Sequence, residues 1–180
     1  NVIKQANDAM AHDKDFSRNA NNYMALDEPY YGETKVLHYL EVLRDVVGFE
    51  ELAKKVVKPL TGKKVAAYYG CLLLRPGKVM QMDNPENPRI MEDFIRALGG
   101  EPVLYPYRNE CCGGYVTLED KALAGKKSSQ VMDSAREMGA ELIITACPLC
   151  LYNLTKNAAR PEVPVVYFTE LLAEALGVKE

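Results

Sequence analysis

The stretch ELIITACPLC, residues 141–150, places a strongly apolar run directly before two cysteines and a proline. The apolar residues Leu142, Ile143 and Ile144 predict a buried strand from 141 to 146. Pro148 suits the first position of a helix, where its missing N–H is not needed. A buried strand, a short loop and a helix together form the repeating unit of parallel α/β sheets.

The same order of elements recurs along the chain from residue 65 onward. Strands are predicted at 65–69, 102–105 and 163–168, and helices at 87–98, 117–138 and 169–176. Strand and helix therefore alternate four times, which predicts an α/β fold with a parallel-type sheet and flanking helices. The sequence contains neither G-x-G-x-x-G nor a P-loop, so this pattern brings no nucleotide-binding signature.

The first 60 residues have a different pattern. Residues 1–31 are polar and Asn-rich, and we expect one short helix to about Asp15 followed by a loop. Apolar residues then recur at helical spacing over 36–47 and again over 49–56. We therefore expect residues 1–60 to form an N-terminal helical extension or linker. Residues 61–180 then form the cysteine-rich α/β domain.

The composition is that of a globular protein rather than a nucleic-acid-binding or membrane protein. The chain has 180 residues, 48% hydrophobic and 26% charged, with a net charge of −3. It contains no apolar run of about 18 residues and no signal peptide, so we expect a cytoplasmic protein that reaches membranes only through partners. It also does not begin with Met, and we expect a piece of a longer chain.

All five cysteines of the chain lie between residues 71 and 150, and each follows a predicted strand. They are Cys71 after the first strand, Cys111 and Cys112 after the second, and Cys147 and Cys150 after the third. Because the loops after parallel strands emerge at the same edge of a sheet, we expect the five sulfurs to lie together at its carboxyl edge.

The residues around these cysteines favour metal binding. Thiolates in this number select zinc, copper(I) or iron–sulfur clusters. Adjacent cysteines such as Cys111 and Cys112 rarely reach disulfide geometry, and they suit two ligands of one large cofactor better. Gly113 and Gly114 allow the backbone to approach such a cofactor and to direct N–H groups toward it. Cys147 also lies where the following helix should begin, which lowers the pKa of a thiol.

The arrangement C-x39-C-C-G-x34-C-x-x-C resembles the CCG cysteine-rich domain of heterodisulfide reductase B subunits. The segments YYGCLL at 68–73, CCGG at 111–114 and GKKV at 62–65 resemble that family as well. The resemblance covers residues 33–176. Members of the family usually carry two such domains, and the resemblance places this chain in the C-terminal half, with the missing copy before Asn1.

The resemblance implies an oxidoreductase that cleaves a disulfide into two thiols. Its cofactor would be a non-cubane [4Fe-4S] cluster. The implied ligands are Cys71, Cys111, Cys112, Cys147 and Cys150. The implied partners are a flavin-bearing subunit, a ferredoxin-like subunit and a thiol or disulfide substrate. Since the active site of the family draws on both halves, we expect the isolated piece to be inactive.

Four other interpretations stay open at this point. The same type of domain occurs in iron–sulfur subunits of lactate, glycolate and succinate oxidoreductases. Four of the thiolates could instead hold a structural zinc ion. Cys147 and Cys150 could act as a thioredoxin-like pair, although this leaves the other three cysteines unexplained. All five could also be buried structural thiols.

Overall fold

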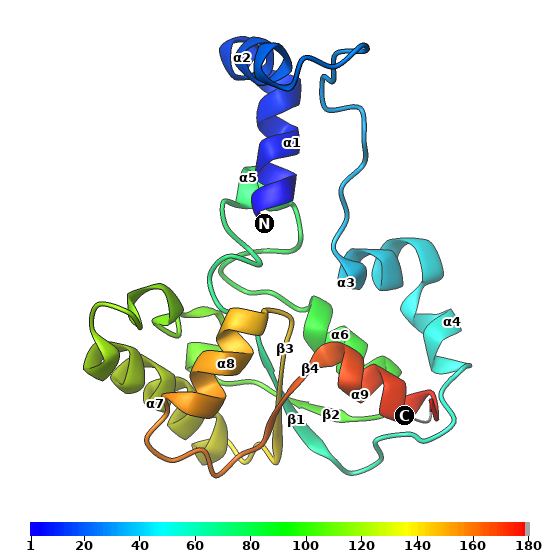
Figure 1. Ribbon diagram of the computed structural model, residues 1–180. Helices are drawn as coiled ribbons and strands as arrows, with labels where there is room; N and C mark the ends of the chain where they lie inside the picture. Colours follow the sequence, from blue (N-terminus) through cyan, green and yellow to red (C-terminus); the bar gives the residue numbers. More distant parts are fainter. Residues whose placement is uncertain (179–180) are drawn as a thin grey trace.

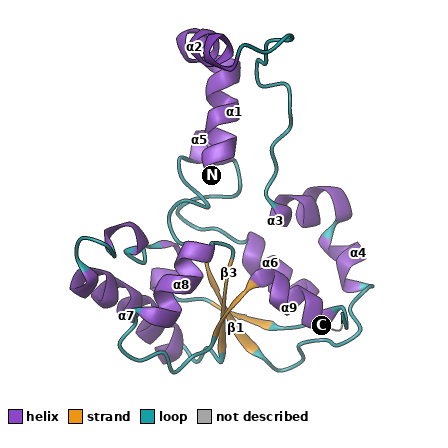
Figure 2. Cartoon of the chain, viewed as in Figure 1, coloured by secondary structure: helices purple, strands orange, loops and turns teal. Residues whose placement is uncertain are grey.

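The computed structural model describes residues 1–178 and contains one parallel sheet of four strands (Figures 1 and 2). The strand order is β2-β1-β3-β4, and every neighbouring pair is parallel. The strands are β1 (Lys64–Tyr68), β2 (Glu101–Val103), β3 (Leu142–Thr145) and β4 (Val165–Tyr167). This confirms the predicted α/β fold with a parallel sheet.

Helices cover both faces of the sheet (Figure 1). One face carries α7 (Lys121–Glu137) and α8 (Pro148–Lys156), and the other carries α6 (Ile90–Ala97) and α9 (Phe168–Ala175). Strand β1 is buried on both faces because its successive side chains point alternately to the two helical layers. Ala66 and Tyr68 lie in the core with Val131 of α7, whereas Val65 and Ala67 lie in the core with α6 and α9.

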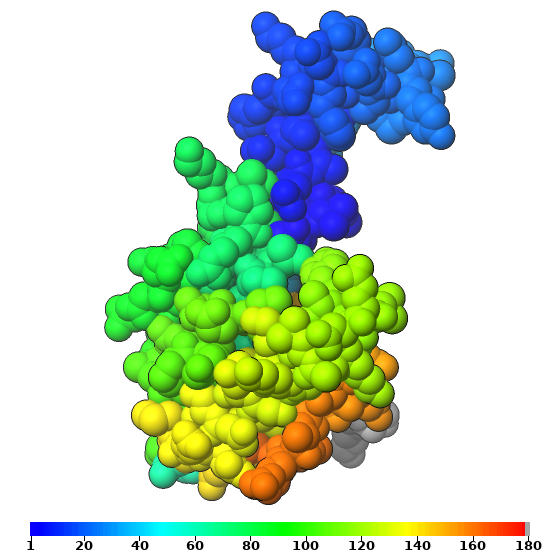
Figure 3. All heavy atoms as spheres, turned by 90° about the vertical axis from the view of Figure 1, so that its left-hand side faces the viewer, coloured from blue at the N-terminus to red at the C-terminus, as the bar shows by residue number. Residues whose placement is uncertain are grey.

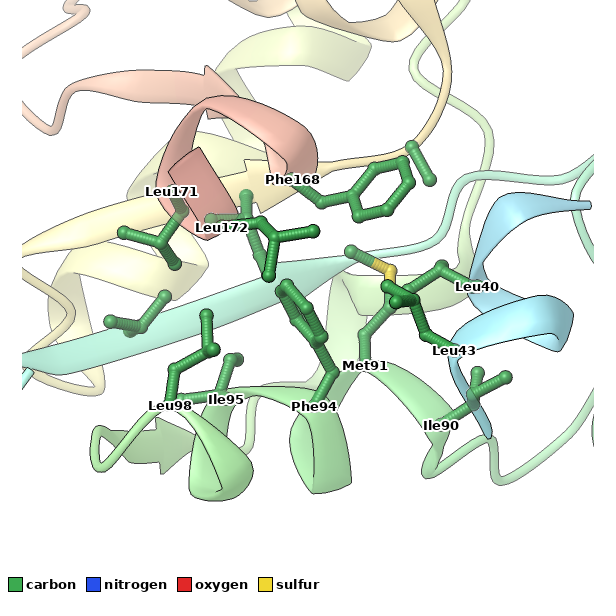
Figure 4. Close-up of a cluster of buried hydrophobic side chains, with 14 of the residues drawn as sticks. Leu40, Leu43, Ile90, Met91, Phe94, Ile95, Leu98, Phe168, Leu171 and Leu172 are labelled. Atoms are coloured by element: carbon green, nitrogen blue, oxygen red, sulfur yellow. The ribbon is translucent and has the colours of Figure 1, made fainter. Parts of the chain in front are cut away.

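The core beside α6 and α9 is built from aromatic and aliphatic side chains (Figure 4). Phe94 of α6 and Phe168 of α9 meet edge to face, with ring centroids 5.9 Å apart. Leu40 and Leu43, from the N-terminal region, pack into the same cluster and are almost fully buried. Part of the N-terminal region therefore completes the core of the α/β domain.

The remainder of the N-terminal region is an arm that projects from the body of the molecule (Figures 1 and 3). It contains α1 (Val2–His12) and α2 (Lys14–Met24). A loop leads from α2 to α3 (Tyr39–Glu41), the π-helical turn η1 (Val42–Val47) and α4 (Phe49–Ala53). Helix α2 replaces the loop that we expected after Asp15, because the Asp13 side chain accepts hydrogen bonds from the amides of Asp15 and Phe16.

The arm is attached to the body by polar contacts at its base. Lys4 forms an ion pair with the buried Glu41, with 2.8 Å between Nζ and Oε1. The side chain of Asn1 donates to the carbonyl oxygens of Leu72 and Arg75, at 2.7 and 3.0 Å. The base of the arm thus lies beside the loop that contains Cys71.

Three short elements lie in the loops around the carboxyl edge. They are the helix α5 (Gly77–Met80) and the 3-10 turns η2 (Pro106–Asn109) and η3 (Gly114–Val116). Within residues 1–178, the structure contains no helix with the length and apolar character needed to cross a bilayer.

Candidate metal centre

The three cysteine loops meet at the carboxyl edge of the sheet, as the sequence predicts. Cys71 follows β1, Cys111 and Cys112 follow β2, and Cys147 and Cys150 follow β3. All five cysteines line one small cavity. The remaining wall is made by Tyr69, Leu72, Leu73, Gly114, Tyr115 and Leu149. Because β1 lies between β2 and β3, the cavity occupies the position at which open α/β sheets bind their ligands.

The cysteines are free thiols that form two groups within this cavity. In one group, the sulfurs of Cys112 and Cys150 are 3.7 Å apart, and Cys147 lies close enough to Cys150 to shift its pKa. In the other, Cys111 lies close enough to Cys71 to raise its pKa. Among residues 1–178, no three His, Cys, Asp or Glu side chains converge on a point where a single ion would be bound.

The hydrogen bonds among these thiols determine where protons are held. The Cys150 thiol lowers the pKa of both Cys112 and Cys147 to about 6 by hydrogen bonding to each. Cys150 has a single thiol proton, which it can donate to only one of these two sulfurs at a time, and its own pKa is strongly raised. Cys147 is the N-cap of α8, and the amides of Leu149 and Cys150 also favour its thiolate. Burial raises the pKa of Cys71 to about 11.

Two glycines allow the loops to approach each other closely. Gly70 has φ +63°, and a Cβ atom at this position would lie 3.0 Å from the sulfur of Cys150. A Cβ atom on Gly114 would lie 2.9 Å from Cγ of Leu149. The amide of Gly113 donates to the sulfur of Cys111, at 3.3 Å. Gly70 and Gly114 therefore permit close contacts between the loops, and the Gly113 amide points to a cysteine sulfur, whereas their approach to a cofactor stays a prediction.

Polar residues that the sequence does not single out hold the Cys111–Cys112 loop in place. Asn153 of α8 and Ser128 of α7 are both fully buried, and both donate to the carbonyl oxygen of Cys112. Thr117, the first residue of the helix predicted over 117–138, lies outside that helix, and its hydroxyl is 3.3 Å from the carbonyl oxygen of Gly113 and 3.1 Å from Oδ1 of Asn153. The one feature of the sequence that could have identified Asn153 is its position three residues after Cys150, on the same side of the predicted helix.

The donor set fits a thiophilic metal centre. The cavity is lined by five sulfur atoms, and its other wall residues are mainly apolar. Thiolate ligands must be deprotonated, and two of the five thiols have a lowered pKa. Soft ligands of this kind bind zinc, copper(I) or iron–sulfur clusters.

Fold and cysteine pattern define a cysteine-rich α/β domain with a shared thiol site, and one family model describes such a domain. This model, the CCG cysteine-rich domain, matches residues 65–155 and spans all five cysteines. The chain belongs to this family, which confirms the family prediction.

Relatives of the chain are components of reductases. It is 36% identical over 157 residues to the 8-methylmenaquinol:fumarate reductase membrane anchor subunit of Wolinella succinogenes, covering 83% of this chain and 55% of that subunit. It is 29% identical over 188 residues to a protein of Archaeoglobus profundus that is similar to heterodisulfide reductase B subunits, covering 97% and 63%. It is also 29% identical to the B subunit of the ferredoxin/F(420)H(2)-dependent CoB-CoM heterodisulfide reductase of Methanosarcina acetivorans, covering 82% and 52%.

The chain spans a little over half the length of these curated relatives. Together with the family match, they bear out the prediction of an iron–sulfur electron-transfer domain related to the B subunits of heterodisulfide reductases. A solved structure of a hypothetical protein from Helicobacter pylori shares the fold, with a TM-score of 0.70 and 10% identity. The match covers 99% of this chain and 33% of that one.

Proposed function

We propose that the five cysteines hold an iron–sulfur cluster and that the chain serves a heterodisulfide-reductase B-type subunit. The observation that carries this proposal is the single cavity lined by Cys71, Cys111, Cys112, Cys147 and Cys150. These cysteines come from three loops that are far apart in sequence and meet at one edge of the sheet. A cofactor with several metal atoms can bind sulfurs that are distributed in this way.

The number of cysteines supports a cluster of the non-cubane [4Fe-4S] type. A structural zinc ion takes four ligands, and an ordinary cubane cluster also takes four cysteines. The cavity here presents five. The proposed ligand set therefore includes all of them, with Cys112 and Cys147 as the thiolates that are formed most readily.

The proposed reaction is the reduction of a disulfide by two electrons and two protons to give two thiols. When bound, the cluster supplies electrons one at a time at a site that a substrate sulfur can approach. The chain's own residues orient the ligands, and Leu72, Leu73 and Leu149 provide apolar walls that limit the access of water. The electrons come from partner proteins, which we propose to be a flavin-bearing and a ferredoxin-like subunit.

A second candidate is an iron–sulfur subunit of a lactate-, glycolate- or succinate-type oxidoreductase. The observation that favours it is the 36% identity to the anchor subunit of a fumarate reductase. In that case, the cysteine site would pass electrons to or from another acceptor, and no disulfide would react there.

The test uses the complex isolated under nitrogen through an affinity tag on this chain. The complex is reduced chemically and mixed with an aliphatic mixed disulfide or, separately, with a soluble quinone. If the chain serves disulfide reduction, the mixed disulfide should reoxidise the complex, which is seen in its visible spectrum. Two thiols should be released for each disulfide consumed. Reoxidation by the quinone alone, without thiol release, would favour the second candidate.

A further inference from the structure

The carbonyl group of Cys112 is held by side chains from two different helices. Asn153 Nδ2, from α8, donates to this oxygen at 2.5 Å. Ser128 Oγ, from α7, donates to the same oxygen at 3.1 Å. A carbonyl oxygen has two lone pairs, so these two donors satisfy it fully. The three residues are all buried, which shields the hydrogen bonds from competing water.

The orientation of the Asn153 amide follows from the Cys112 carbonyl, which can only accept a hydrogen bond. Thr117 Oγ1 donates to Asn153 Oδ1 at 3.1 Å, and the side-chain amide of Asn157 donates to the same oxygen. If the amide were flipped, its oxygen would face the Cys112 carbonyl oxygen, and two acceptors would repel each other. The Cys112 carbonyl therefore selects the orientation in which the NH₂ group points to Cys112, and in that orientation Asn153 Oδ1 accepts from Thr117 and Asn157.

Asn153 and Cys150 belong to the same helix and lie three residues apart, so they project from one side of α8. The sulfur of Cys150 is 3.7 Å from that of Cys112. One rigid helix therefore carries a candidate ligand and also fixes the backbone of a second candidate ligand.

We propose that Asn153 is a positioning residue of the metal centre, which sets the distance between the Cys112 and Cys150 sulfurs through the Cys112 carbonyl. Ser128 acts on the same carbonyl from the other helix. The expected change in the properties of a bound cluster rests on the proposed function. The expected loosening of the Cys111–Gly114 loop does not.

The test compares Asn153→Ala and Ser128→Ala, each of which removes one donor from the Cys112 carbonyl. Thr155→Ala is the matched control. Thr155 lies on α8 as well, but its hydroxyl bonds to the carbonyls of Leu151 and Tyr152 in its own helix. Ser128→Ala removes less side-chain volume than Asn153→Ala does. It therefore provides a second test of the Cys112 carbonyl if Asn153→Ala does not fold.

The first readout is amide hydrogen exchange of the full chain without metal, measured by mass spectrometry. We expect exchange in peptides over 111–116 to accelerate by about tenfold in Asn153→Ala and Ser128→Ala. Exchange over 142–145 in β3 should stay as in the wild type, and Thr155→Ala should change neither region. Unchanged exchange over 111–116, or a uniform acceleration across the domain, would overturn a local positioning role.

The second readout uses cluster-loaded protein. We expect both variants to shift the midpoint potential and the electron paramagnetic resonance signal in the same direction, because they act on the same carbonyl. Thr155→Ala should shift neither. A wild-type protein that takes up no iron and sulfide would contradict the proposed function, while the exchange measurement would still decide the role of Asn153. Loaded variants with wild-type potential and spectrum would contradict the positioning role alone.

Discussion

At the scale of single residues, Cys150 is the central thiol of its group, because it interacts with both Cys112 and Cys147. Its sulfur lies 3.7 Å from that of Cys112, and hydrogen bonding with Cys150 lowers the pKa of Cys112 and of Cys147. Cys71 and Cys111 lie across the same cavity. This arrangement explains why a cofactor that spans the cavity would use all five residues.

Substitution of each cysteine by serine tests that claim. If all five are ligands, each single Cys→Ser variant should bind less than about half of the iron that the wild type binds, because a neutral hydroxyl is a poor ligand for a soft metal. Iron and acid-labile sulfide are measured after anaerobic reconstitution, with circular dichroism to confirm folding. A variant that keeps full iron content identifies a cysteine outside the ligand set and argues for a four-ligand site.

Gly70 offers a second test, with Gly62 as its matched control. Both have positive φ, at +63° and +75°, so alanine at either position costs about 1–2 kcal/mol in backbone strain. A Cβ atom on Gly62 meets nothing within 4 Å, whereas one on Gly70 lies 3.0 Å from the Cys150 sulfur. We expect Gly70→Ala to reduce iron content and Gly62→Ala to leave it unchanged.

Chemical denaturation of the two glycine variants separates strain from displacement of the sulfur. Gly62→Ala should lower the free energy of unfolding by the strain alone. Equal iron content in both variants would show that the contact between Gly70 and Cys150 does not matter for the site.

The elements were predictable from the sequence because strands and helices alternate with clear periodicity. The placement of the cysteines followed from that alternation, since loops after parallel strands share an edge. Helix starts were less predictable because their capping residues are distant or ambiguous in sequence. Asp83 accepts from the amides of Arg89 and Ile90 and begins α6 there, although Asn87 and Pro88 looked like the start. Asp120, rather than Thr117, caps α7.

The polar residues that hold the Cys111–Cys112 loop were not predictable, because their partners are also distant in sequence. Asn153, Ser128 and Thr117 belong to separate elements, and their hydrogen bonds depend on how α7 and α8 pack on the sheet. The sequence contains no spacing that relates Ser128 to Asn153. The cysteines could be assigned to one site from the sequence because each follows a predicted strand.

The start of α3 makes the stability of the protein dependent on pH. His38 Nδ1 accepts a hydrogen bond from the amide of Leu40, at 3.1 Å, and burial lowers the pKa of His38. Glu41 opposes this shift, and Lys4 adds to it. The unfolded chain therefore binds a proton below about pH 6.5 that the folded chain resists, so stability falls as pH decreases through that value.

Replacement of His38 by asparagine tests this dependence. Asparagine retains an oxygen that can accept from the Leu40 amide, but it does not titrate. The free energy of unfolding of wild type minus variant should decrease from about pH 7.5 to about pH 5.5, as measured by urea denaturation. A difference that stays constant over this range would show that His38 has an ordinary pKa in the folded protein.

At the scale of the whole molecule, we propose a division at residue 60. Residues 61–180 contain the sheet and all five cysteines, and residues 1–60 form the helical extension. Within the extension, Leu40, Leu43 and Leu52 pack into the core of the domain. The arm of α1 and α2 projects away from that core (Figure 3).

Removal of the arm tests how much of the extension the domain requires. A chain that begins at Lys35 retains the three core leucines and should fold with a cooperative thermal transition. It loses the Lys4–Glu41 ion pair, but Glu41 then becomes accessible to water, so we expect a loss of about 1–2 kcal/mol rather than the larger cost of a buried unpaired charge. A non-cooperative transition would show that α1 and α2 are part of the domain itself.

The central claim is that five cysteines from three loops hold one iron–sulfur cluster. Its most direct test is the iron, acid-labile sulfide and zinc content of the protein purified without oxygen, with a visible spectrum recorded on the same sample. The claim predicts iron and sulfide in near-equal amounts, about four of each per chain, with little zinc. About one zinc per chain without sulfide would contradict it and would indicate a structural metal site.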